Sequence, residues 1–263
     1  MYRRCAVISV VVLTSATLPS PTHASRLTLH DAIVNYLKTR HGTVTVAVHD
    51  YVANRDYVVY HERVAWTASV VKVEILETLL HQNKGHLSSS ERANAKRMIE
   101  NSDNDAAEDL WEDIGEGRAL DAFSDLAELT STHSDPRGRW GRTITGAQDQ
   151  LKLIQLLETG NKLLTDDSRR YVKSLMHNVE SDQRWGACAH HPSDAWTMNK
   201  NGWSPIADDS YLWTVNSDCY VHSKTKRYSI SVLDKHNSSE SYAITTIEGV
   251  AAIVVKYMKT YPT

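Results

Sequence analysis

Hydrophobic and polar positions follow two different periods along this chain, and each change of period marks a new element. Residues 28–39 carry apolar side chains at helical spacing until Gly42 ends the pattern. Residues 43–51 and 55–62 are rich in β-branched and aromatic side chains and are separated by the three-residue stretch VAN. Two short strands this close together predict a β-hairpin.

A long run of helical patterns follows the hairpin. Residues 69–83 are almost entirely apolar, which predicts a buried helix. The serines ahead of Glu91 predict a capped helix that ends near residue 101. Further helical patterns begin at residue 104 and cover residues 116–129, 146–158 and 164–181.

The strand pattern returns in the last third of the chain. Three β-rich runs joined by short turns cover residues 195–203, 210–222 and 227–236, and a helix from about residue 238 to 261 closes the chain. This order predicts an α+β fold. One five-stranded antiparallel sheet is flanked by the N- and C-terminal helices, and an all-helical insert forms a second lobe.

The composition is that of an ordinary globular protein. The 263 residues are 41% hydrophobic and 23% charged, enough for one large domain or two lobes. We place an α/β lobe at residues 25–68 and 190–263 and a helical lobe at residues 69–189. The net charge is −3 and no basic tract is present, which argues against nucleic acid and anionic membrane surfaces as partners.

The first 24 residues have the character of a secretion signal. Arg3 and Arg4 precede a short apolar run, AVISVVVL, and small residues follow up to Ala24. The run is too short to span a membrane. We expect a signal peptide, residues 1–24, that is cleaved after Ala24 to leave a secreted protein without a membrane span. The alternative is an ordinary N-terminal helix.

Two cysteines, Cys188 and Cys219, would then lie in an oxidising compartment, where we expect them to form a disulfide. A metal site is the alternative, because His190, His191 and His222 lie close to them in the sequence. The spacings match no standard zinc-binding pattern, so we favour the disulfide and expect no metal.

Ser69 and Lys72 are the unusual residues of the apolar helix. Residues three apart lie on one helix face, so the lysine amine can reach the serine oxygen. Apolar neighbours would lower the pKa of the amine and let it act as a base. Alternatively Ser69 caps the helix and Lys72 extends to solvent. The spacing also occurs at Ser223 and Lys226, in a polar segment.

Two more motifs follow in order. The stretch SDN places Ser102 and Asn104 between two predicted helices, and the stretch KNG, Lys200 to Gly202, lies in a predicted strand. With Ser69-x-x-Lys72, this series resembles the class A β-lactamase and penicillin-binding peptidase family along nearly the whole mature chain. The resemblance implies an active-site serine hydrolase with no cofactor.

The same resemblance implies a role for each residue of the motifs. Ser69 would be the acylated nucleophile and Lys72 its base. Ser102 would relay a proton to the leaving nitrogen, assisted by the charge of Lys200. Asn104 would hold the amide of the substrate.

The third motif also supplies the rest of the substrate site. Gly202 lets the substrate approach the strand closely, and the backbone N–H groups of Ser69 and Trp203 would form the oxyanion hole. Asn201 stands where the family has threonine or serine, and we expect its amide to replace that hydroxyl at the substrate.

One departure from the family concerns the second half of the reaction. Class A enzymes activate the deacylating water with a glutamate on the loop that corresponds to residues 130–143, and this loop contains none. Glu128 precedes the loop, and Asp135 is the one carboxylate inside it, so Asp135 is the candidate base. Without a base the acyl-enzyme would persist, as in penicillin-binding proteins.

Three functions remain open on the sequence alone. The first is hydrolysis of a β-lactam through an acyl-enzyme on Ser69. The second is a D-alanyl-peptide carboxypeptidase, and the third is a non-catalytic module that binds cell-wall peptides. In each case the partner is a β-lactam or a cell-wall peptide, and we expect a monomer.

Overall fold

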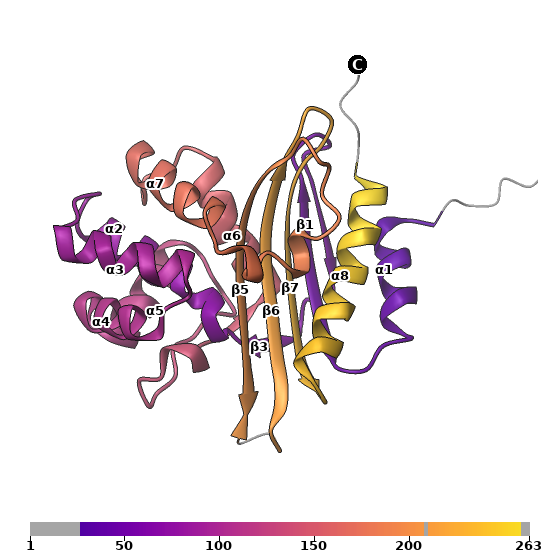
Figure 1. Ribbon diagram of the computed structural model, residues 1–263, viewed down its shortest axis with the longest axis horizontal. Helices are drawn as coiled ribbons and strands as arrows, with labels where there is room; N and C mark the ends of the chain where they lie inside the picture. The colour runs from indigo at the N-terminus through magenta and orange to yellow at the C-terminus, as the bar shows by residue number, and fades with distance from the viewer. Residues whose placement is uncertain (1–26, 208–209, 259–263) are drawn as a thin grey trace, which may run out of the picture.

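A five-stranded antiparallel sheet runs through the middle of the molecule in the computed structural model, which describes residues 27–207 and 210–258 (Figure 1). The strand order is β2–β1–β7–β6–β5. The strands are β1 (Thr43–Asp50), β2 (Arg55–Val59), β5 (Trp196–Ile206), β6 (Leu212–His222) and β7 (Arg227–Asn237). All neighbouring pairs are antiparallel. The predicted α+β fold with one five-stranded sheet is therefore confirmed.

Two helices from opposite ends of the chain lie side by side on one face of this sheet (Figure 1). They are α1 (Leu29–Leu37) and α8 (Glu240–Tyr257). Alternate residues of a strand point to opposite faces. Val46 and Val48 accordingly belong to the core under α1 and α8, whereas Ala47 packs on the opposite face against Ala147 and Leu151.

The remaining helices lie on that opposite side of the sheet (Figure 1). They are α2 (Val71–Gln82), α3 (Ser89–Glu100), α4 (Asn104–Ile114), α5 (Glu116–Leu126), α6 (Ala147–Glu158) and α7 (Asp166–His177). Helix α3 begins as predicted, with a capping box in which Ser88 and Glu91 satisfy each other's backbone N–H groups.

Helix α2 is the central helix of this group and is buried on every side from Val71 to Leu80. Two of its buried residues are carboxylic acids, Glu74 and Glu77. Burial raises the pKa of Glu74 to about 8, although Ser124 donates a hydrogen bond to its Oε1. Burial and the neighbouring Glu74 raise the pKa of Glu77 well above its usual range. Burial therefore favours the neutral form of both side chains.

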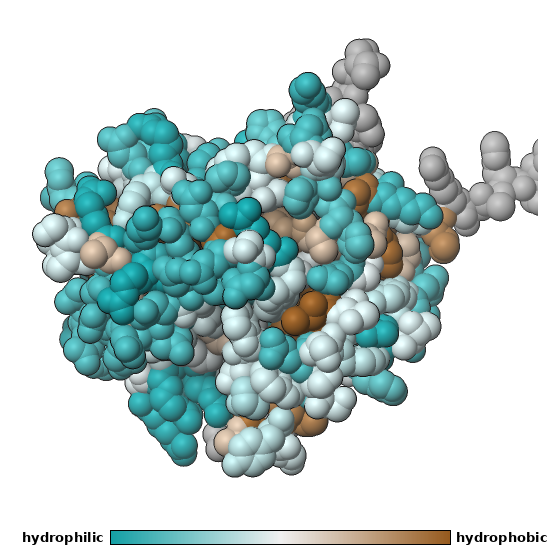
Figure 2. All heavy atoms as spheres, in the orientation of Figure 1, coloured by the Kyte–Doolittle hydropathy of each residue, from teal (hydrophilic) through white to brown (hydrophobic). Residues whose placement is uncertain are grey.

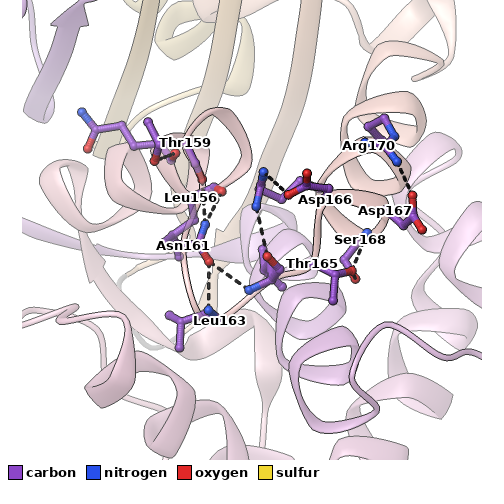
Figure 3. A network of polar contacts seen from close by, with 12 residues as sticks. Leu156, Thr159, Asn161, Leu163, Thr165, Asp166, Asp167, Ser168 and Arg170 are labelled. Atoms are coloured by element: carbon purple, nitrogen blue, oxygen red, sulfur yellow. Dashed lines mark hydrogen bonds and ion pairs between the residues drawn. The ribbon is translucent and has the colours of Figure 1, made fainter.

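Helix α7 is anchored at its N-terminus by the connection from α6 (Figure 3). The Asn161 amide donates to the carbonyl oxygens of Leu156 and Thr159 and accepts from the N–H groups of residues 163 and 164. Thr165 then caps α7 by accepting a hydrogen bond from the N–H of Ser168.

Several short elements have no counterpart in the predictions. Strands β3 (Val64–Trp66) and β4 (Ile144–Gly146) form a two-stranded sheet. Four 3-10 turns are η1 (Ala68–Val70), η2 (Trp140–Arg142), η3 (Ser181–Gln183) and η4 (Gly186–Cys188). Segments of three residues are too short to carry a hydrophobic period, so the sequence pattern could not indicate them.

The predicted pairing of Cys188 with Cys219 is present, with a sulfur–sulfur distance of 2.03 Å. It ties η4 to the middle of β6. Within residues 27–207 and 210–258, no group of three or more His, Cys, Asp or Glu side chains is arranged to hold a metal ion.

The outer surface of the helical side is largely hydrophilic, with small apolar patches nearer the sheet (Figure 2). No helix in the described part of the chain combines the length and apolar character that crossing a membrane requires. The signal peptide expected at residues 1–24 lies outside the described residues.

Candidate active site

Ser69 lies in η1, the 3-10 turn that leads directly into the N-terminus of α2. The preceding residue, Ala68, has a φ of 47° and so adopts the left-handed conformation that non-glycine residues seldom occupy. This turn leaves Ser69 half-buried at the positive end of the helix dipole. The position suits a nucleophile that develops negative charge as it loses its proton.

Lys72 lies one turn further along and is fully buried. Its Nζ donates hydrogen bonds to the carbonyl oxygen of Ser102 at 2.7 Å, to Oδ1 of Asn104 at 2.8 Å and to Oγ of Ser102 at 3.3 Å. The ring of Trp140 lies 4.9 Å from the same atom. Burial lowers the pKa of Lys72 to about 7, so ammonium and free amine are both accessible near neutral pH.

Ser102 sits in the turn between α3 and α4 with a φ of 55°. Asp103 holds the next residues in place, because its Oδ1 accepts the N–H of Ala106 at 2.8 Å as the cap of α4. Its Oδ2 also pairs with Arg97 at 2.9 Å. The strained turn and the cap together present Ser102 and Asn104 to the same lysine.

Lys200 approaches Ser102 from the sheet. Its Nζ donates to Oγ of Ser102 at 2.9 Å, so that this hydroxyl lies between two lysine amines. Burial and the neighbouring Lys72 hold the pKa of Lys200 well below its usual range, and Asp218 acts in the opposite direction. The structure thus brings together Ser102, Lys72 and Lys200, which lie up to 128 positions apart in the sequence.

Gly202 is where β5 passes closest to the nucleophile. A Cβ at this position would lie 2.6 Å from the backbone nitrogen of Ser69 and 2.8 Å from the carbonyl oxygen of Thr67. Only glycine permits this approach, because both contacts are to backbone atoms that cannot move aside. The next residue, Trp203, is half-buried and lines the cavity beside Ser69.

The structure does not support the expected contact between Asn201 and the substrate. The side chain of Asn201 is 1% exposed. Both of its N–H groups are used, by the carbonyl oxygens of Gln183 at 2.8 Å and Trp185 at 3.1 Å, and Ser217 donates to its Oδ1. Residues of a strand alternate between faces, so Asn201 faces away when Lys200 and Gly202 face the site.

A cavity of about 550 Å³ opens beside Ser69. The helices contribute Asn104 and Glu108, and β5 contributes Trp203 and Ser204. The other lining residues are Ala68, Ser69 and the loop residues Arg137, Gly138, Arg139, Trp140, Gly141 and Arg142. Tryptophan rings from the loop and from β5 give the cavity two apolar walls, as is usual for small-molecule sites.

The loop carboxylate proposed as a base, Asp135, is engaged elsewhere. Its carboxylate accepts from Nε of Arg139 at 2.6 Å and from a second guanidinium nitrogen at 3.3 Å. The hydrogen bond from Arg139 outweighs burial and lowers the pKa of Asp135. Asp135 does not line the cavity beside Ser69.

Glu108 also lines the cavity, although it belongs to none of the sequence motifs. It lies four residues after Asn104 on α4, so both side chains share one face of that helix. The four-residue spacing from Asn104 indicates a shared helix face, but only the fold shows that this face is turned toward Ser69.

The comparison with protein families decides where this chain belongs. The model of the Beta-lactamase2 family, described as the beta-lactamase enzyme family, matches residues 90–258. The chain is a member of the beta-lactamase enzyme family. The matched range contains Ser102, Asn104 and Lys200, and the Ser69-x-x-Lys72 motif lies ahead of it.

Curated relatives of this beta-lactamase-family chain match a part of it. Proteins named "Putative lipoprotein LppW" from Mycobacterium bovis (strain ATCC BAA-935 / AF2122/97) and Mycobacterium tuberculosis (strain ATCC 25618 / H37Rv) are 30% identical over 123 residues. That alignment covers 46% of this chain and 39% of each relative.

Solved structures show the fold over almost the whole chain. TLA-1 extended-spectrum β-lactamase matches with a TM-score of 0.75 and 17% identity over 87% of this chain and 97% of that chain. A β-lactamase from Burkholderia vietnamiensis matches with a TM-score of 0.75 and 16% identity over 89% and 98%. A class A β-lactamase representative from Bacteroides cellulosilyticus DSM 14838 matches with a TM-score of 0.74 and 14% identity over 88% of this chain and 99% of that chain. At these identities the similarity establishes the class A β-lactamase fold.

Proposed function

We propose that this protein is a secreted serine hydrolase that opens the amide bond of a β-lactam through an acyl-enzyme on Ser69. One observation carries the proposal: Oγ of Ser102 lies between the amines of Lys72, at 3.3 Å, and Lys200, at 2.9 Å, beside the nucleophile turn. Two buried amines on one hydroxyl are costly for folding, so a proton-transfer role is the better explanation.

The acylation step follows from these positions. Ser69 Oγ attacks the substrate carbonyl carbon, and its proton passes to the free amine of Lys72. Ser102 Oγ then donates a proton to the leaving nitrogen and is reprotonated from the amines beside it. The ammonium of Lys200 favours that transfer, because it stabilises negative charge on the Ser102 oxygen.

The substrate would be held by β5 and α4. Gly202 brings β5 close enough for the N–H groups of Ser69 and Trp203 to meet the oxyanion as it forms. Asn104 accepts from Lys72 through Oδ1, and its N–H groups make no hydrogen bond within residues 27–207 and 210–258. They are therefore free to bind the carbonyl of the substrate's own amide. The Asn201 side chain has no part in this arrangement.

Export rests on separate observations. The first 24 residues read as a secretion signal, and the disulfide between Cys188 and Cys219 is of the kind that persists in oxidising compartments. The relatives named as lipoproteins support the same location.

A D-alanyl-peptide carboxypeptidase of the penicillin-binding type is the second candidate. The loop of residues 130–143 contains no glutamate, and its Asp135 is held by Arg139, which favours slow deacylation of a β-lactam. This candidate predicts release of D-alanine from a D-alanyl-D-alanine peptide. A module that only binds such peptides would release none and would form no adduct.

The test is the intact mass of the mature protein over time after benzylpenicillin is added, compared with Ser69→Ala. We expect an adduct on the wild type that is absent from the variant, followed by its decay as product appears. An adduct of equal amount on both proteins, or unchanged antibiotic with no adduct on either, would contradict the proposal.

A further inference from the structure

Hydrolysis of an acyl-enzyme needs a base that activates water, and the residues that the sequence offers for it are badly placed. Asp135 is 12% exposed, is bound by Arg139 and lies outside the cavity. Glu128 lies two residues after the end of α5, ahead of the loop, and does not line the cavity either.

Glu108 is the one carboxylate among the described residues that line the cavity with Ser69. It is exposed, so water can reach it. Its Oε2 accepts a hydrogen bond from Nε1 of Trp140 at 2.8 Å, and no hydrogen bond to its Oε1 occurs within residues 27–207 and 210–258. The hydrogen bond from Trp140 therefore holds Oε2 in place, while Oε1 is open to a water molecule in the cavity.

Trp140 links this carboxylate to the catalytic amine. Its indole N–H binds Glu108, and its ring lies 4.9 Å from Nζ of Lys72. Lys72 in turn binds Asn104, one helical turn before Glu108. These contacts form a closed circuit that runs from Glu108 through Trp140, Lys72 and Asn104 back to the same face of α4. The circuit of contacts would hold the Glu108 carboxylate in a defined position beside the acylated serine.

We propose that Glu108, which comes from α4 and not from the loop, activates the water that releases the acyl group from Ser69. The inference rests on the proposed function, because it concerns the second half of that reaction. The base that activates the deacylating water would thus come from a helix, because the loop of residues 130–143 has no carboxylate available for that role.

The water oxygen attacks the ester carbonyl carbon of acylated Ser69 while the Glu108 carboxylate takes one of the water protons. The bond between that carbon and Ser69 Oγ then breaks, and the proton passes from Glu108 to Ser69 Oγ. The product acid leaves, and both side chains return to their starting states.

The test compares the lifetime of the benzylpenicillin adduct in four proteins: the wild type, Glu108→Gln, Glu112→Gln and Asp135→Asn. Glu112 is the matched control, since it is exposed on the same helix one turn later and does not line the cavity. We expect Glu108→Gln to acylate at the wild-type rate and its adduct to decay at least about 100-fold more slowly, the usual contribution of a general base. The two other variants should decay like the wild type.

Three results would overturn the inference and leave acylation of Ser69 intact. They are wild-type decay in Glu108→Gln, slow decay in Asp135→Asn alone, and a wild-type adduct that persists for hours. An absent adduct with unhydrolysed antibiotic in every protein would overturn the proposed function itself.

A second variant protects the test against misfolding. Glu108→Asp keeps a carboxylate on a shorter side chain, so its adduct should decay faster than that of Glu108→Gln and more slowly than that of the wild type. Equal decay in Glu108→Asp and Glu108→Gln, with both proteins melting like the wild type, would count against a role for the carboxylate.

Discussion

Lys200 on β5 and Asp218 on β6 are directly paired residues of neighbouring antiparallel strands, and both are buried. Burial raises the pKa of Asp218 to about 7, and Asp218 favours the charged form of the lysine beside it. Directly paired residues of antiparallel strands point to the same face of the sheet, so Asp218 shares the face from which Lys200 contacts Ser102. We expect the carboxylate to support the charge of Lys200 electrostatically.

This pairing predicts the effect of Asp218→Asn. Loss of the carboxylate removes the attraction that favours the Lys200 ammonium, so the lysine should be neutral over a wider pH range. We expect acylation at pH 7 to slow by about tenfold, which corresponds to roughly 1.4 kcal/mol of lost charge stabilisation, and the pH profile to change. Asp125→Asn, on the exposed surface of α5, is the control. An unchanged rate and profile would show that Asp218 is only structural.

Lys72 predicts a pH dependence of acylation. The base must be the free amine, and the pKa of Lys72 is lowered by burial to about 7. The acylation rate should therefore rise with pH and reach half of its maximum near pH 7. Stopped-flow or quenched mass measurements between pH 5 and 9 give the profile. Lys72→Met should acylate slowly at every pH, and a variant that kept the wild-type profile would remove Lys72 from the mechanism.

The close approach at Gly202 predicts that Gly202→Ala will be severe. The new Cβ would lie 2.6 Å from the Ser69 nitrogen, so β5 and the nucleophile turn must separate. We expect a loss of about 100-fold or more in the acylation rate, the size of effect seen when an oxyanion-hole donor is removed. Gly160→Ala is the matched control, because a Cβ there meets nothing within 4 Å. Similar rates in the two variants would contradict the assigned oxyanion hole.

The buried carboxyl of Glu74 predicts a pH dependence of stability. The folded protein keeps the proton up to about pH 8, whereas the unfolded chain loses it near 4.5. Between these two pH values the folded state binds more protons than the unfolded chain. The stability that the protonated Glu74 carboxyl contributes is therefore lost as the pH rises from about 4.5 to about 8. Glu74→Gln should gain stability relative to the wild type from pH 5 to 8 in urea denaturation. A constant difference across that range would show that Glu74 ionises normally.

The disulfide predicts a loss of stability on reduction. Cys188 and Cys219 are 31 positions apart, and closing a loop of that length is worth about 3–4 kcal/mol in the chain-entropy model. Urea denaturation with and without a thiol reductant measures the difference, with the Cys188→Ser, Cys219→Ser double variant as the reference. Reductant should not change the double variant, and equal midpoints for the wild type under both conditions would contradict a stabilising bridge.

Much of the fold follows from hydrophobic periodicity alone. The strand and helix patterns are long, and the order in which they occur leaves few ways to cover a five-stranded sheet. The motifs around Ser69, Ser102 and Lys200 indicated one site although they are far apart in the sequence. The structure places Lys72 and Lys200 on the same Ser102 hydroxyl.

The sequence could not give the parts of the site that depend on tertiary packing. Glu108 and Trp140 are 32 positions apart, and their hydrogen bond exists only because the loop folds back over α4. Asn201 is a different case, since strand alternation already places it on the face opposite Lys200 and Gly202. The expectation for Asn201 came from the motif, and the backbone geometry of β5 overrules it.

Location of the covalent adduct tests the central claim most directly. After a brief exposure to benzylpenicillin, the protein is quenched in acid and digested with trypsin. Cleavage after Arg63 and Lys72 gives the peptide of residues 64–72, in which Ser69 is the single serine. We expect the penicilloyl mass on that serine. An adduct on the peptide that contains Ser102, or a labelled residue 64–72 peptide in Ser69→Ala, would contradict it.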